Sequence, residues 1–233
     1  MQLHDQTGTV YAITPQTDAI LPDVFVRDAT GRLVSVAYQP TNFALQRQRT
    51  LSLTLNANGL LGKPPPPPPP GSSSGVRQVP SYYGGIGPTI KFLDRLQLRP
   101  GTPALDLLDG DTINGAGTSR VYGYIYGGIN YQGFGATFDG WCSAPSRVRG
   151  ATPAEDLRFS SVVRLNFAAY MPVHRLLERE KWTRGMQLRL EVSNVIDHRQ
   201  EVRDASGATP NRYQSDYLDP TGRAVTLTLR KFL

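Results

Sequence analysis

The residues that could perform chemistry are few and widely separated along the chain. His4, His174 and His198 lie far apart and none has HExxH-like neighbours, so catalytic zinc has no support. Cys142 is the only cysteine, which excludes an internal disulfide and a cysteine-based zinc site. A thiol nucleophile needs a nearby base, and the strand position of Cys142 favours an inert packing thiol. We therefore expect no metal site.

The stretch DGDTINGAG has the beginning of a calcium-binding loop. Asp109 and Asp111 stand at alternate positions, as the first ligands of an EF-hand do. Ile113 then occupies the next ligand position, and Arg120 stands where the bidentate glutamate belongs. The pattern predicts a polar turn and no calcium site.

Nucleotide and acid–base chemistry also lack a motif. Gly85-Ile86-Gly87 is followed by Pro88 and by no third glycine, and no GK[ST] sequence occurs. No cluster of acidic and basic residues indicates a cleft for a hydrolase. We expect no enzyme, no catalytic residue and no cofactor.

Composition bounds the partners. The 25 Lys and Arg residues against 19 Asp and Glu give a net charge of +6 that is spread along the chain, whereas nucleic-acid binding needs clustered charge. We expect no nucleic acid as a partner.

The start, MQLHDQTGTVYAITPQTDAI, has no positive stretch followed by an apolar core, so we expect no secretory signal in this chain.

The elements that must position these residues alternate apolar with polar side chains, which is typical of strands with one face in water. In GMQLRLEVSN the apolar set is Met186, Leu188, Leu190 and Val192, and in the last run it is Val225, Leu227 and Leu229. Similar alternation covers TLSLTLNANGL, IKFLDRLQLRP, VYGYIYGGIN, FGATFDGWCS and DLRFSSVVRLNFAAY. We predict one strand for each of these runs, with a tight hairpin turn at Tyr131-Gln132-Gly133.

The connections are of two kinds. GKPPPPPPPGSSSG contains seven consecutive prolines, which cannot donate ladder hydrogen bonds, so 62–75 is predicted to be a proline-rich connector. An SH3-type ligand is the alternative for this run. Long polar loops are predicted at 99–118, 145–155 and 197–222. No window holds the roughly 20 apolar residues of a membrane-spanning helix, so any membrane function must be carried by strands.

Aromatic residues leave two interpretations open. Trp141, Trp182 and the tyrosines could form a girdle at a membrane interface, or they could be ordinary residues of a sheet. The tyrosines concerned are Tyr122, Tyr124, Tyr126, Tyr131 and Tyr170.

The last third of the chain has a corner at Asn194-Val195-Ile196-Asp197, which leads into a long loop and then into a Gly-Arg-led final strand, AVTLTLRKFL. This arrangement resembles the closing hairpin of a TonB-dependent outer-membrane receptor. VFVRDATGRLVSV, RPGTPALDLLDG and ATPAEDLRFSS resemble segments of the alphaproteobacterial branch of this family. The chain departs from the family at its end, where Leu233 replaces the usual aromatic residue and Phe232 comes one place early.

The resemblance implies a fold and a function. It implies an all-β, antiparallel up-and-down sheet of about seven or eight strands, with 1–233 as the C-terminal segment of a transmembrane β-barrel in the outer membrane. The intact receptor would take up a scarce ligand, such as a ferric siderophore, cobalamin or a carbohydrate, and its partners would be the TonB complex, the barrel assembly machinery and outer-membrane lipid. The residues expected to face lipid and to form the assembly strand are Leu188, Leu190, Val192, Val225, Leu227, Leu229 and Leu233.

Strand number limits what such a segment does alone. Transporters of this type close with about 22 strands, and an open sheet in lipid leaves edge groups unpaired at several kcal/mol each. We expect a fragment that does not function without a plug and the earlier strands, although closure into an unusually small barrel is an alternative. The competing hypothesis is a soluble β-sandwich binding module with a proline-rich hinge, in which the apolar faces cover each other.

Overall fold

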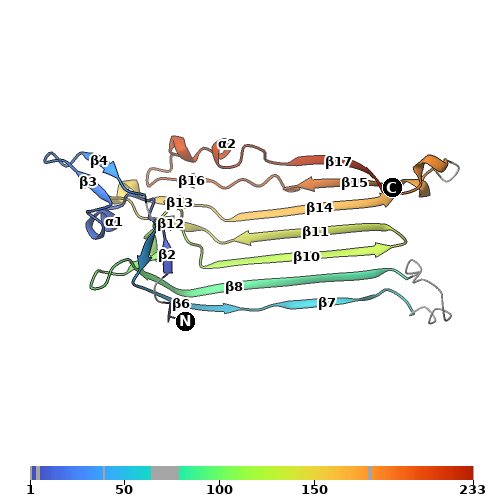
Figure 1. The fold of residues 1–233 in the computed structure, drawn as a ribbon, viewed down its shortest axis with the longest axis horizontal. Helices are drawn as coiled ribbons and strands as arrows, with labels where there is room; N and C mark the ends of the chain where they lie inside the picture. The colour runs from blue at the N-terminus through green and yellow to red at the C-terminus, as the bar shows by residue number, and fades with distance from the viewer. Residues whose placement is uncertain (1, 4–5, 39, 64–78, 178–179, 233) are drawn as a thin grey trace.

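The computed structural model describes residues 2–3, 6–38, 40–63, 79–177 and 180–232 (Figure 1). The protein is mostly β and its sheets are antiparallel, as the sequence predicts. Most of the predicted connector at 62–75 lies outside the described residues.

One large sheet dominates the molecule, and its long strands follow one another in chain order (Figure 1). Within the described residues it has ten strands, more than the seven or eight predicted, and eight of them lie on one path. In sheet order the path is β1 (Gln2–Leu3), β6 (Leu45–Ser52), β8 (Ser81–Gln97), β10 (Val121–Tyr131), β11 (Phe134–Ser143), β14 (Val162–Pro172), β15 (Met186–Ser193) and β17 (Ala224–Lys231). Two more strands pair with β8, namely β7 (Leu55–Leu60) and β9 (Leu105–Asp106).

The smaller elements gather mostly at one end of this sheet, which we call the loop end (Figure 1, left). They include two helices, α1 (Pro15–Ile20) and α2 (Ser215–Leu218). Short pairs and a three-stranded sheet are formed by β2 (Gln6–Gly8), β5 (Thr41–Phe43), β3 (Phe25–Arg27), β4 (Leu33–Val36), β12 (Ser146–Val148), β13 (Leu157–Phe159) and β16 (Val202–Arg203). Single 3-10 turns are η1 (Leu107–Asp109), η2 (Pro153–Glu155), η3 (Val173–Arg175), η4 (Lys181–Thr183) and η5 (Asn211–Tyr213).

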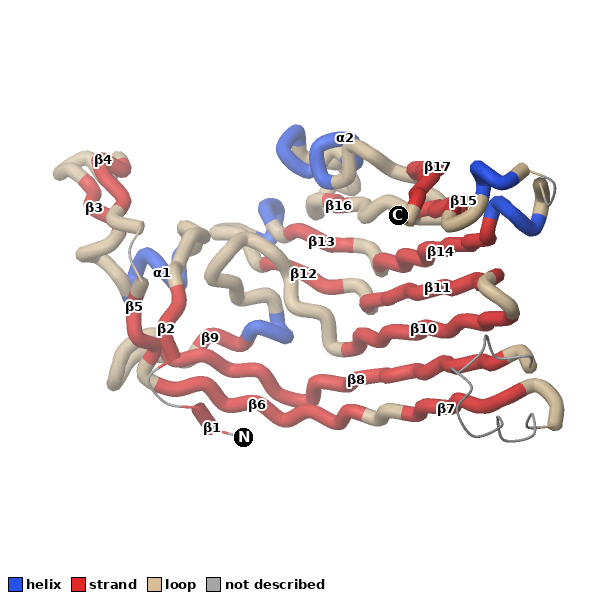
Figure 2. The backbone as a smooth tube through the Cα atoms, turned by 45° about the vertical axis from the view of Figure 1, so that its right-hand side comes forward, coloured by secondary structure: helices blue, strands red, loops and turns tan. Residues whose placement is uncertain are grey.

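The buried cores lie among these loop-end elements. The larger cluster joins Leu96 and Leu98, at the end of β8, to residues around α1 and β3, including Leu21 and Phe25. The smaller cluster consists of Val148, Phe159 and Val202, one from each strand of the three-stranded sheet. Both clusters fix the loops to each other, and the long strands extend away from them (Figure 2).

The register of the main sheet separates its side chains into two faces. Residues opposite each other in adjacent strands project from the same face, and successive residues alternate. The row Val225, Val192, Phe167 and Phe138 is apolar across four strands, and so is the row Leu227, Leu190, Ala169, Ala136 and Ile129. We call this side the apolar face. The other side, the polar face, holds rows such as Thr226, Glu191, Ala168 and Thr137.

Glycines on the polar face receive tyrosine rings from the neighbouring strand. Tyr124 and Tyr126 of β10 stand opposite Gly87 and Gly85 of β8, and a Cβ atom on either glycine would collide with the ring. Tyr170 covers Gly135 in the same way. Aromatic rings lying over strand glycines restore the packing that a missing side chain would leave out. Tyr122, Tyr124, Tyr126, Tyr170 and Trp141 therefore lie on the polar face, which favours ordinary sheet residues over an interface girdle, whereas Tyr131 shares the apolar face with Ile129.

The strand predicted from IKFLDRLQLRP is longer than expected. β8 begins at Ser81. Its first half contains glycines and Pro88, which weaken the strand pattern in the sequence, and the sheet accommodates them. Pro88 has no N–H to donate, and the neighbouring strand is interrupted beside it, between β6 and β7. The carbonyl oxygen of Pro88 accepts a hydrogen bond from the backbone N–H of Leu53 in this interruption. The strand predicted over 50–60 is thus divided at Leu53–Thr54 into β6 and β7, which both pair with β8 and keep Leu51 and Leu55 on one face.

The single strand predicted from DLRFSSVVRLNFAAY is wrong. It is divided at Ser160–Ser161 into β13 and β14, which belong to different sheets. Phe159 is only 6% exposed in the smaller core, whereas Val163 and Phe167 stand exposed on the apolar face. The predicted hairpin is confirmed: Gln132 and Gly133 both have positive φ, as a type I′ turn requires.

Gly140→Ala tests how closely the strands approach. A Cβ atom at Gly140 would lie 2.7 Å from the backbone oxygen of Arg164, which cannot move without disturbing the ladder. We expect a loss of about 1–3 kcal/mol in unfolding free energy, measured by urea titration of the chain in detergent. Gly123→Ala is the matched control on the same face, because its nearest neighbour would be at 3.5 Å. Equal stability of the two variants would contradict the close approach.

Candidate functional site

The structure brings six of the predicted site residues together on the apolar face. Val192, Leu190 and Leu188 of β15 lie directly opposite Val225, Leu227 and Leu229 of β17. The side chains on β17 are largely uncovered, with exposed fractions of 66%, 67% and 56% for Val225, Leu227 and Leu229. The seventh residue, Leu233, lies outside the described residues, as does His4.

Exposed apolar side chains continue across the rest of this face. Its further members are Leu51, Leu53, Leu55, Ile86, Ile90, Ile125, Ile129, Phe138, Val163 and Phe167. Monomers in water rarely expose an apolar patch that spans a whole sheet. Cys142 stands on this face between Gly123 and Val163 and is exposed, so the expected packing role is wrong.

The polar face contains a buried carboxylate that the sequence did not single out. Asp94 of β8 is 2% exposed. Its side chain accepts hydrogen bonds from Gln46 Nε2 at 2.9 Å and Gln48 Nε2 at 3.1 Å, and forms an ion pair with Lys91 Nζ at 3.1 Å. The available signal is that Asp94 is the single acidic residue of the run IKFLDRLQ. These partners make Asp94 a structural group that holds β6 to β8.

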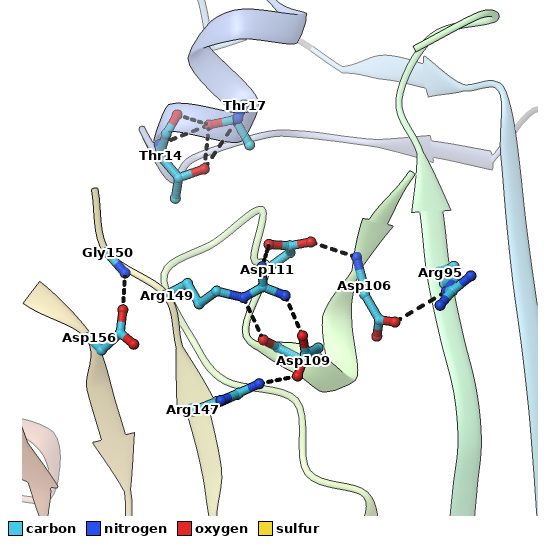
Figure 3. A network of polar contacts seen from close by, with 10 residues as sticks. All are labelled: Thr14, Thr17, Arg95, Asp106, Asp109, Asp111, Arg147, Arg149, Gly150 and Asp156. Atoms are coloured by element: carbon cyan, nitrogen blue, oxygen red, sulfur yellow. Dashed lines mark hydrogen bonds and ion pairs between the residues drawn. The ribbon is translucent and has the colours of Figure 1, made fainter. Parts of the chain in front are cut away.

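A polar network at the loop end connects two of the predicted loops (Figure 3). Asp109, in the turn η1, accepts hydrogen bonds from Arg147 and, at 2.5 Å, from Arg149 Nη2. Asp111 accepts from the backbone N–H of Asp106, and Asp106 in turn pairs with Arg95 Nε at 3.1 Å. The loop at 99–118 is thereby fixed to the loop at 145–155 and to β8.

The third predicted loop joins the same assembly. Val202 of β16 pairs with Phe159 of β13, and the Tyr213 hydroxyl donates to the backbone oxygen of Gly115 at 3.3 Å. Sequence reasoning placed these three loops separately, since nothing local predicts strand pairing between them.

The Asp109 carboxylate is occupied by arginine. The hydrogen bond from Arg147 is the main cause that lowers the pKa of Asp109, with the charges of Arg147, Arg149 and Arg120 acting in the same direction. Both oxygens are taken by guanidinium groups, which agrees with the predicted polar turn.

Three wider observations bear on chemistry. In the part of the chain that the structure describes, no three His, Cys, Asp or Glu side chains come together as metal ligands. Across the same residues, no helix has the length and apolar character to cross a membrane. Comparison with family models, curated proteins and solved structures gives no match.

Asp94→Ala tests the buried carboxylate. The substitution removes the acceptor of Gln46 and Gln48, while Lys91, whose side chain is 22% exposed, can turn to water. We therefore expect a loss of about 1–3 kcal/mol in unfolding free energy by urea titration. Arg95 is the next residue of β8 after Asp94. Arg95→Ala breaks its exposed ion pair with Asp106, and we expect this variant to lose less than about 1 kcal/mol of unfolding free energy. Similar losses for the two variants would show that Asp94 does not hold the strands together.

Proposed function

We propose that this chain is the C-terminal segment of a TonB-dependent outer-membrane receptor, and that it supplies consecutive strands to a large transmembrane barrel. The observation that carries the proposal is the continuous apolar face, which crosses every long strand of the sheet and is left exposed. Hydrocarbon chains are the partner that such a face fits, and the polar face then lines the barrel interior.

Strand length supports this proposal. A membrane-crossing β-strand needs about 9–11 residues when it is tilted. β8 has 17 residues, β10 and β14 have 11 each, and β11 has 10. β6, β15 and β17 have 8 residues each and β7 has 6, so these strands are shorter than that length.

The difference between the two ends of the sheet also supports it. Outer-membrane barrels have long loops on the outside and short turns on the periplasmic side. Here the three long loops lie at one end (Figure 1). The other end carries the two-residue turn between β10 and β11, the end of β17, and the connection between β14 and β15 that contains η3 and η4. The loop end is thus the external side in the proposed receptor.

Strand direction limits how the proposed barrel could close. β6 and β17 are joined by six antiparallel steps and therefore run in the same direction. Within the described residues, β17 pairs only with β15 and β7 only with β8. An antiparallel closure then needs an odd number of further strands. β1 pairs with Arg47 and Gln46 in the direction that the last of these strands would have.

The proposed activity belongs to the completed receptor. It is uptake of a scarce ligand, of the siderophore, cobalamin or carbohydrate class, driven through the TonB complex, after insertion by the barrel assembly machinery. The chain contributes lipid-facing strands and external loops to that receptor.

Leu227→Arg distinguishes this proposal from a soluble module. In a bilayer, an arginine on the lipid face costs about 2–4 kcal/mol, so binding of the chain to phosphatidylcholine vesicles should fall sharply in a flotation assay. Thr228→Arg is the control, because Thr228 is the next residue of β17 and lies on the polar face. This variant should bind the vesicles about as well as the wild type.

Wild-type behaviour provides the second arm of this test. We expect the chain to stay dispersed only with detergent or lipid. A monomer that is stable in buffer, with vesicle binding absent and Leu227→Arg harmless, would favour the soluble β-sandwich module instead.

A further inference from the structure

Three arginines form a row across the small sheet at the loop end. Arg147 of β12 lies directly opposite Arg158 of β13, and Arg158 lies directly opposite Arg203 of β16. Directly opposite residues project from the same face with Cα atoms about 4.5–5.5 Å apart. We call Arg147, Arg158 and Arg203 the arginine row.

Such a row needs compensation, because like charges directly opposite each other destabilise a sheet. The outer two members have it: Arg147 pairs with Asp109, and Arg203 pairs with Glu201 at 3.1 Å. Arg158, in the middle, forms no ion pair or side-chain hydrogen bond with any residue that the structure describes. The central guanidinium is therefore available to an anion from outside the chain.

A hollow of about 600 Å³ lies beside the row. Its charged lining consists of Arg120, Arg147, Arg158 and Asp109, and the hydroxyls of Thr118 and Ser146 also border it. The one carboxylate in this lining is already engaged by Arg147 and Arg149. Arg120 and Arg158 are exposed at the hollow, so its uncompensated charge is positive.

We infer that this hollow binds a small polyanion, through Arg158 and Arg120, with Arg147 positioned at its edge by Asp109. Guanidinium groups hold carboxylates and phosphates through paired N–H donors, and several in a row fit a ligand with more than one such group. Resting on the proposed function, this assigns to the external loops a ligand whose recognised groups are carboxylates or phosphates.

The opposite face of the small sheet explains why the arginines are held rigidly. Val148, Phe159 and Val202 form the buried cluster there, and the ring of Tyr213 packs edge-on against Phe159 at 5.6 Å between centroids. The arginine backbone positions are thus fixed by a core, which reduces what the site must order on binding.

The test is calorimetric titration of the full chain in neutral detergent with citrate and with pyrophosphate, at low salt. We expect Arg158→Gln to weaken binding about tenfold or more, which is the loss expected for a charge-assisted hydrogen bond. Arg158→Lys should retain part of the affinity. Arg175→Gln is the matched control, since Arg175 is exposed in η3 at the other end of the sheet.

Three outcomes would overturn the inference: no binding of either anion at millimolar concentration, equal weakening by Arg175→Gln, or unfolding of Arg158→Gln and Arg158→Lys with wild-type affinity in Arg120→Gln. Anionic phosphatidylglycerol vesicles are tested separately. Binding of these vesicles through Arg158, without binding of citrate or pyrophosphate, would assign the site to lipid headgroups. Because binding is measured in detergent, it can fail while vesicle insertion succeeds, or succeed while insertion fails, which separates this inference from the proposed function.

Discussion

The antiparallel hydrogen-bond ladder of the main sheet holds each long strand in a register that keeps side chains of like polarity opposite one another. A slip of one residue in any strand would move its apolar set to the other face. The pairing of Leu188, Leu190 and Val192 with the last strand therefore cannot be separated from their common exposure. The continuous apolar face, the polar interior proposed for the barrel and the exposed outer strands all depend on this register.

Two kinds of packing support the molecule in different places. Along the strands, stability comes from backbone pairing and from tyrosine rings lying over glycines, with Asp94 and its partners joining β6 to β8 on the polar face. At the loop end it comes from two conventional apolar clusters and from the Asp109 network. Loops that carry function are commonly held by a rigid scaffold in this way.

Much of the fold could be predicted from local pattern, and the failures have physical causes. The sequence locates β10, β11, β15 and β17 correctly, because their regular period of two is a strong signal. The Gln132-Gly133 turn between β10 and β11 is located for the same reason. The first half of β8 was missed because glycine and Pro88 conceal a strand whose glycines are filled by rings from its neighbour. The break at Ser160 was missed because the alternation of Phe159 and Val163 continues across two separate sheets.

The candidate site divides in the same way. The six described site residues of the apolar face follow from periodicity alone, so the sequence predicts their common face. The arginine row does not, because β12, β13 and β16 are strands of two or three residues that come from distant loops. Only their pairing places Arg147, Arg158 and Arg203 side by side.

The length of β8 bears on how far the loop end would lie from the membrane in the proposed receptor. Seventeen residues of strand extend about 57 Å, and at a tilt of about 45° they rise about 40 Å, which exceeds the roughly 30 Å thickness of a hydrocarbon core. In the proposed receptor, the segment that carries Leu96 and Asp94 would then project into the aqueous layer as a stem. The cap built on that stem would meet arriving solutes at a distance from the lipid headgroups.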